Sequence, residues 1–171
     1  MKLKAYFLMA SVLLSGVSAV GIRDAKPVEG VHPGDLAPRI ELSGKGQPAI
    51  YFQNPDGRYT LVHFWAAYDA ESRARNVLLW NKVNRLNATG KGKVAMYSIS
   101  FDEASSVFEG TIRTDKLVGT TQLHEAEGRH SDLFRTYGLE KGFKNLLIND
   151  EGVIIASNVS PDELAQLCDR I

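Results

Sequence analysis

Two apolar runs separated by a helical segment constrain the fold of this chain more than any other feature. Residues 59–65 read YTLVHFW and residues 94–101 read VAMYSISF. Nearly continuous runs of β-branched and aromatic residues are typical of buried central strands. Between them, residues 69–87 place Leu79 and Val83 on one face of an expected helix. A strand, a helix and a second strand in this order predict a β-α-β unit.

Shorter elements flank this unit. Before it, residues 40–42 and 49–52 are expected to form a short hairpin. After it, we expect a partly helical segment, a short strand, a short helix, a strand hairpin and a final helix, over residues 102–117, 120–124, 131–137, 145–156 and 160–170. The last helix opens on Ser160-Pro161-Asp162-Glu163, which is a capping box with proline in the first turn. Such alternation predicts an α/β fold with a central mixed sheet and helices on both faces.

The first nineteen residues have the pattern of a secretory signal peptide. Lys2 and Lys4 precede an apolar run over residues 5–14, and Val17-Ser18-Ala19 supplies small residues before a cleavage site. The apolar run is too short for a comfortable membrane span. We therefore expect cleavage after Ala19, export to a periplasm or beyond, and no membrane attachment afterwards. The alternative is an uncleaved N-terminal anchor.

The remaining length suits one domain. Residues 20–33 are rich in proline and glycine and are expected to form an extended lead-in, with a single domain over residues 34–171. The 171 residues carry 20 Lys and Arg against 20 Asp and Glu, and removal of the leader would leave 18 against 20. This balance argues against a nucleic-acid or acidic-membrane partner.

Five short segments follow one another along the chain: GDLAP at 34–38, LVHFWA at 61–66, YSISFD at 97–102, YGL at 137–139 and LINDEG at 147–152. In this order they resemble the thioredoxin-like fold and, within it, the exported TlpA-like thiol–disulfide oxidoreductases. The resemblance implies a three-layer sandwich: a central mixed β-sheet, helices on both faces and an N-terminal β-hairpin.

The chain departs from this family where its chemistry occurs. The family reads FWA-x-W-C-x-x-C-R, and here Asp69 and Ser72 stand at the two cysteine positions, with Ala70 and Glu71 between them. Phe143 occupies the position of the family's cis-proline, so an ordinary trans peptide bond is expected there. The degenerate redox-site positions are Asp69, Ala70, Glu71, Ser72 and Phe143.

Asp69 has a structural and a chemical interpretation. A carboxylate at the start of a helix can cap free N–H groups and meet the positive end of the helix dipole. The alternative is a catalytic carboxylate, with exposed Glu71 as the only neighbouring acid. A hydrolase that uses Ser72 and His63 is a further alternative, but the chain has no G-x-S-x-G motif around Ser72.

An aromatic groove could lie beside these positions. Trp65, Tyr68 and His63 are the candidate groove residues, with Phe143 opposite, and relatives bind extended peptides at this place by main-chain pairing. The plainer interpretation leaves Trp65 in the core and Tyr68 alone exposed.

No cofactor or metal is predicted. The single cysteine, Cys168, rules out an intrachain disulfide, a CxxC pair and a cysteine-based zinc site, and we expect it to pack against the final helix's apolar neighbours. An exposed thiol that dimerises the protein is the alternative. His124, Glu125, Glu127 and His130 could meet around a loop, although a solvated polar loop is the simpler expectation.

Together these features predict an exported, redox-inactive thioredoxin-like protein. We expect it to act as a binding or accessory module for an unknown protein partner or extended peptide. A family member's usual role as a thiol–disulfide oxidoreductase or antioxidant is the alternative that the resemblance implies.

Overall fold

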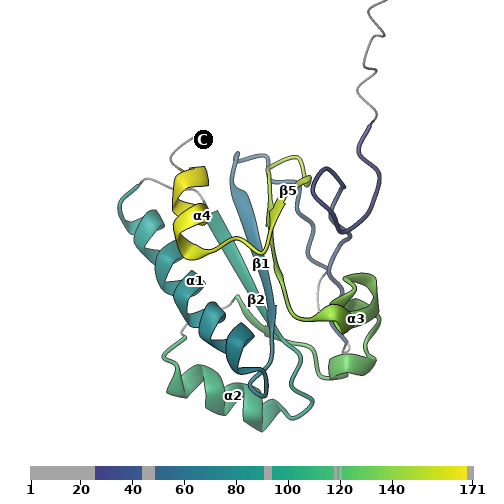
Figure 1. The fold of residues 1–171 in the computed structure, drawn as a ribbon, viewed down its shortest axis with the longest axis vertical. Helices are drawn as coiled ribbons and strands as arrows, with labels where there is room; N and C mark the ends of the chain where they lie inside the picture. Colours follow the sequence, from purple (N-terminus) through teal and green to yellow (C-terminus); the bar gives the residue numbers. More distant parts are fainter. Residues whose placement is uncertain (1–25, 44–48, 91–93, 118, 120, 169–171) are drawn as a thin grey trace, which may run out of the picture.

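A mixed five-stranded sheet forms the centre of the molecule in the computed structural model, which describes residues 26–43, 49–90, 94–117, 119 and 121–168 (Figure 1). The strand order is β3-β2-β1-β4-β5. Strands β1 and β2 are parallel, β2 and β3 are parallel, and β4 and β5 run antiparallel to their neighbours. The strands are β1 (Tyr59–Trp65), β2 (Val94–Ser100), β3 (Gln122–His124), β4 (Asn145–Ile148) and β5 (Ile154–Ser157).

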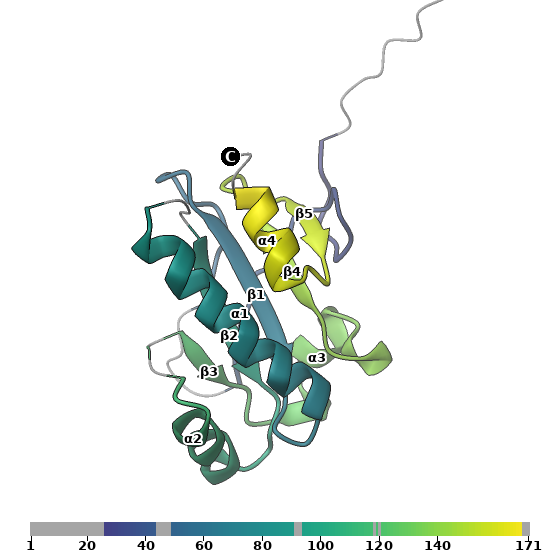
Figure 2. The same ribbon diagram turned by 60° about the vertical axis from the view of Figure 1, so that its left-hand side comes forward.

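Helices lie on both faces of this sheet, as the sequence predicts (Figure 2). Helices α1 and α4 cover one face, and α3 and the N-terminal segment cover the other. The helices are α1 (Ala70–Ala88), α2 (Ser105–Thr114), α3 (Asp132–Thr136) and α4 (Pro161–Cys168), with single 3₁₀ turns η1 (Gly128–His130) and η2 (Leu139–Lys141).

Each face of the sheet has its own apolar core, because side chains alternate along a strand. On the α1 face, Leu61 and Leu147 pack with Leu79 and Val83 of the helix. The opposite core contains aromatic and aliphatic residues from the sheet, α3 and the N-terminal segment, including Val62, Phe64, Ile99, Tyr137 and Ile40.

The predicted N-terminal hairpin is present as one bridge and not as two strands. Ile40 and Ile50 exchange two backbone hydrogen bonds, of 3.0 and 2.8 Å. The lead-in also differs from the extended segment that was expected. Its Leu36 N–H donates to the carbonyl of Val28, so residues 28–36 form a closed loop, and Gly34 N–H donates to Ile154 on the outer edge of β5. The predicted signal peptide and the end of the final helix lie outside the described residues.

Candidate functional site

The connection between β1 and α1 carries Asp69 and Ser72, the two residues that the sequence resemblance aligns with cysteines. Asp69 is the N-cap of α1: its backbone is extended, and its Oδ1 accepts a hydrogen bond of 2.8 Å from the Ser72 N–H. This confirms the capping role predicted for Asp69. Glu71 follows in the first turn, where its negative charge suits the helix dipole, and it forms a 2.7 Å ion pair with Arg75.

Ser72 and His63 lie side by side, but not as a nucleophile and its base. The buried Ser72 hydroxyl donates to the Asp69 main-chain carbonyl at 3.2 Å and accepts weakly from Ala66 N–H at 3.4 Å. His63 Nε2 lies 2.9 Å from the Ser72 carbonyl oxygen, not from its hydroxyl. General-base activation of a serine requires contact with its Oγ. The arrangement therefore does not support the hydrolase alternative.

The bond to Ser72 also fixes the state of the imidazole. A carbonyl oxygen only accepts, so His63 Nε2 carries a proton and Nδ1 is a bare acceptor in the neutral ring. Burial lowers the pKa of His63 to about 4, against a weaker raising effect of the Ser72 hydrogen bond, and the positive charge of Arg75 lowers it further. The ring is therefore neutral at pH 7.

Phe143 lies in the loop that leads into β4 and faces the start of α1. No cis peptide bond occurs among the described residues, which confirms the trans bond expected before Phe143. Its ring centroid lies 6.2 Å from that of Tyr68, 5.9 Å from that of Phe101 and 6.2 Å from that of Phe134. Phe143 thus belongs to an aromatic cluster with Tyr68, Phe101 and Phe134.

Tyr68 is the exposed member of this cluster, at 53% of its full exposure. Arg129 holds its ring: Arg129 Nε donates to the Tyr68 hydroxyl at 3.0 Å, and the guanidinium carbon lies 4.9 Å from the ring centroid. The Tyr68 hydrogen bond raises the pKa of Arg129. Trp65 is fully buried and contacts the ring of Phe108, so the prediction that Trp65 lines a groove is wrong.

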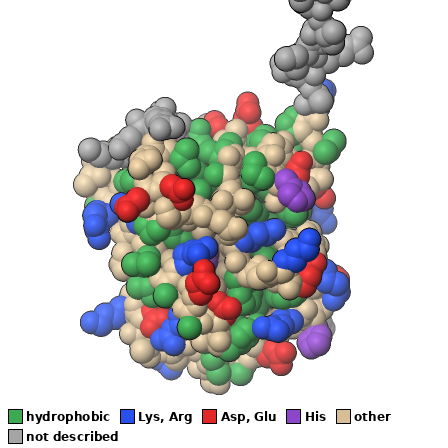
Figure 3. All heavy atoms as spheres, in the orientation of Figure 1, with side chains coloured by type: hydrophobic (Ala, Val, Ile, Leu, Met, Phe, Trp, Pro, Cys, Tyr) green, Lys and Arg blue, Asp and Glu red, His purple; other side chains and the backbone are tan. Residues whose placement is uncertain are grey.

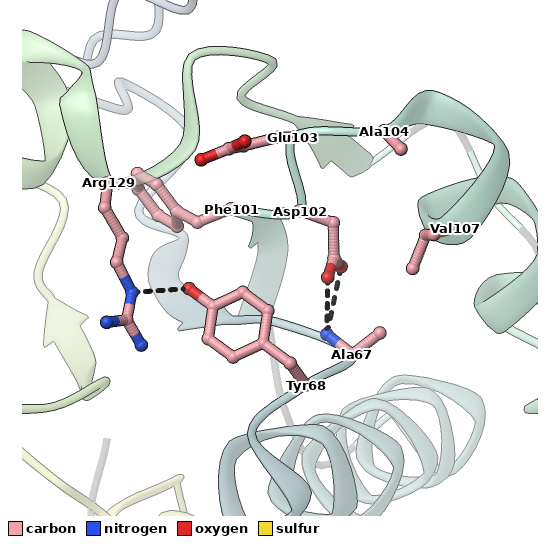
Figure 4. Close-up of a pocket in the computed structure, with 8 residues that line it drawn as sticks. All are labelled: Ala67, Tyr68, Phe101, Asp102, Glu103, Ala104, Val107 and Arg129. Carbon is pink, nitrogen blue, oxygen red and sulfur yellow. Dashed lines mark hydrogen bonds between the residues drawn. The ribbon is translucent and has the colours of Figure 1, made fainter.

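A hollow of about 640 Å³ opens beside Tyr68, between the β1–α1 and β2–α2 connections (Figure 4). Asp102 forms its inner wall, and its carboxylate accepts from Ala67 N–H at 2.9 and 3.0 Å and from Ser100 Oγ at 2.7 Å. These bonds hold the two connections together. The lining residues are Ala67, Tyr68, Phe101, Asp102, Glu103, Ala104, Val107 and Arg129.

A smaller and more polar hollow, of about 230 Å³, lies on the other side of the α1 start. It brings together His63 and four of the five positions that the sequence predicts to be degenerate, all except Ala70. His63 is 1% exposed, so it forms the floor here and not an open groove. The lining residues are His63, Asp69, Glu71, Ser72, Arg75, Lys141, Gly142 and Phe143.

Two of the four candidate metal ligands, His124 and Glu125, make structural contacts, whereas Glu127 and His130 are exposed. Glu125 is fully buried and accepts from the backbone N–H groups of Ser43 and Glu127, while the His124 ring stacks on Phe108 at 5.0 Å. Within the described ranges, no three His, Cys, Asp or Glu side chains are grouped so that they could hold a metal ion.

Cys168 lies at the end of α4, 7% exposed, in the apolar cluster beneath α1 and α4. This confirms its predicted packing position and does not favour an exposed, dimerising thiol.

Among the helices that the structure describes, none combines the length and the apolar character that a membrane crossing requires.

Solved structures with the same architecture define the class of protein. A thioredoxin-like protein from Parabacteroides distasonis is 56% identical to this chain, with a TM-score of 0.75, over 84% of this chain and 98% of its own. The thioredoxin domain of a thiol-disulfide oxidoreductase from Bacteroides vulgatus is 22% identical, with a TM-score of 0.64, over 82% of this chain and 98% of its own. A thiol-disulfide oxidoreductase from Bacteroides fragilis is 23% identical, with a TM-score of 0.61, over 80% and 98%.

These matches define a thioredoxin-like fold, as the sequence resemblance implied. At 56% identity over nearly the whole of the Parabacteroides protein, the chain belongs to the thioredoxin-like family. No protein-family model matches the chain, and no curated protein matches it.

Proposed function

We propose that this protein is an exported thioredoxin-like module that carries out no thiol–disulfide exchange and binds a protein partner. One observation carries the first half of the proposal. The Asp69 carboxylate caps α1 where the family has its attacking thiolate, and the only cysteine in the chain is buried on α4. In Figure 1, α4 lies beside the later turns of α1, away from the end at which α1 begins.

Exchange chemistry requires a thiolate that attacks a sulfur and a second thiol that resolves the mixed disulfide. Asp69 cannot form a disulfide, and the Ser72 hydroxyl donates its hydrogen bond to the main-chain carbonyl of Asp69. The fold around these residues nevertheless keeps helix α1, which Asp69 caps, and the loop between β1 and α1. A fold retained without its reactive atoms is consistent with a role in binding.

The surface around Tyr68 supports the binding half of the proposal. Tyr68 and Val107 are exposed at 53% and 45% beside the larger hollow, and Phe143 packs against Tyr68. Exposed aromatic and aliphatic side chains with an arginine at the rim are typical of protein contact surfaces. Arg129, whose guanidinium lies over the Tyr68 ring, is the arginine of this surface. On the molecular face shown in Figure 3, positive and negative side chains are interspersed.

An insulin-reduction assay with dithiothreitol tests the absence of exchange activity. We expect the wild-type protein and Cys168→Ser to give the background rate. Turnover above background that survives Cys168→Ser would overturn this half of the proposal.

Chemical crosslinking in an envelope extract, followed by affinity capture, tests the contact surface. Tyr68→Ala should lower the yield of crosslinked partner, whereas Tyr51→Ala should not, because Tyr51 is 63% exposed and lies outside the larger hollow. Equal yields from both variants would refute the assignment of this surface.

N-terminal sequencing of the protein recovered from the periplasm tests export, with Val20 as the expected first residue.

A further inference from the structure

A row of buried polar side chains crosses the sheet beneath the start of α1. Asn145 on β4 pairs in register with His63 on β1, His63 pairs with Ser98 on β2, and Ser98 pairs with Gln122 on β3. All four side chains point to the α1 face and are at least nine-tenths buried. Four adjacent strands thus contribute one continuous polar row to the interface between the sheet and α1.

Helix α1 contributes two polar residues above this row. Ser72 and Asn76 are four residues apart, so they lie on the same face, and both are buried. Asn76 Oδ1 accepts from Ser98 Oγ at 2.7 Å, and the Ser72 carbonyl contacts His63 Nε2 at 2.9 Å. These two bonds bring the sheet row and the helix residues into one cluster.

The cluster contains more hydrogen-bonding groups than its own members satisfy. His63 Nδ1, Asn76 Nδ2 and both amide atoms of Gln122 are buried and have no hydrogen-bond partner among the described residues. Asn145 differs, because its amide bonds to both the N–H and the carbonyl of Val159. Buried polar groups are nearly always paired, and each one left unpaired is costly, so the unpaired groups indicate a further component.

We propose that this cluster is an internal hydration site, in which at least one bound water donates to His63 Nδ1 and accepts from Asn76 Nδ2. The mixture of groups selects water over an ion. The neutral His63 ring offers an acceptor, Asn76 offers a donor and Gln122 offers both, whereas a cation needs several acceptors and an anion needs several donors. Water fits because it donates and accepts, and buried water typically makes two to four such bonds. His63 and Ser72 of this cluster also line the smaller, polar hollow at the start of α1.

Magnetic relaxation dispersion of water nuclei tests this site on the folded protein, because it counts long-lived internal waters. Asn76→Leu replaces the donor with an apolar side chain of similar size and should lower the count by one or more. Asn84→Leu makes the same change on the same helix at an exposed position and should leave the count unchanged. An equal count in the wild-type protein and in folded Asn76→Leu would overturn the proposal.

A second measurement needs no variant. Long-range ¹H–¹⁵N correlation spectra of the wild-type protein report the tautomer of His63 and whether its bare nitrogen accepts a hydrogen bond. We expect a proton on Nε2 and a hydrogen-bonded Nδ1. A proton on Nδ1, or an Nδ1 resonance characteristic of a nitrogen without a donor, would overturn the proposal even if Asn76→Leu does not fold.

Discussion

Replacing Asp69 tests whether its carboxylate stabilises the fold as the N-cap of α1. Asp69→Ala removes the 2.8 Å bond to the Ser72 N–H, which is a free N–H group of the first helical turn. Loss of an N-cap side chain costs about 1 kcal/mol, and loss of a negative charge at a helix N-terminus costs a further ~0.3–1 kcal/mol. We therefore expect Asp69→Ala to lower the free energy of unfolding by about 1–2 kcal/mol. For a chain of this size, each kcal/mol lowers Tm by about 2–4 °C.

Two further variants separate the two contributions. Asp69→Asn keeps an oxygen that caps the helix and removes only the charge, so its loss should stay within about 0.3–1 kcal/mol. Asp69→Ser also keeps a capping oxygen, so it should likewise be more stable than Asp69→Ala. Urea unfolding followed by far-UV circular dichroism measures all three. If Asp69→Ala matched the wild type, or if Asp69→Asn were as unstable as Asp69→Ala, the capping argument would be refuted.

Three other predictions concern stability and thiol reactivity. Because burial lowers the pKa of His63 from 6.5 to about 4, the unfolded chain binds more protons between these values. The free energy of unfolding should therefore fall as pH drops from 6.5 towards 4, and His63 should contribute up to about 3 kcal/mol to this fall. Urea titrations at several pH values should show a flatter pH dependence for His63→Gln than for the wild type, and an equal pH dependence would contradict this. The Arg73 guanidinium donates two hydrogen bonds, of 2.6 and 2.7 Å, to the Asp115 carboxylate at the end of α2. A double-mutant cycle with alanine should give a coupling energy of about 1 kcal/mol for this partly exposed pair. A coupling energy of zero would show that the contact is not maintained in solution. Cys168 is 7% exposed, so Ellman's reagent should react slowly with the native protein and rapidly after denaturation, and fast native reaction would place this thiol at the surface.

Local sequence signals predicted much of the fold. The apolar run at residues 59–65 has the same bounds as β1, because every residue after the first is buried and no turn residue interrupts it. The final helix also begins as its capping box requires: Ser160 Oγ accepts from Glu163 N–H, and the Glu163 carboxylate accepts from Ser160 N–H. These features depend on neighbours in the chain, which a sequence shows directly.

The sequence was least informative where distant segments meet. Trp65 reads as a groove residue because of its neighbours, but the packing of α2 buries it against Phe108. Arg129 is 61 residues from Tyr68, and only the folded chain brings the two together. The polar row beneath α1 was equally hidden, since its members come from four strands and their register was not known in advance.

The most direct test of the central claim is a side-by-side insulin-reduction measurement on the wild-type protein and on the double variant Asp69→Cys with Ser72→Cys. Because the double variant places two thiols at the start of an intact α1, we expect the background rate from the wild type and a rate above background from the double variant. Reduction by the wild type at the rate of the double variant would contradict the account.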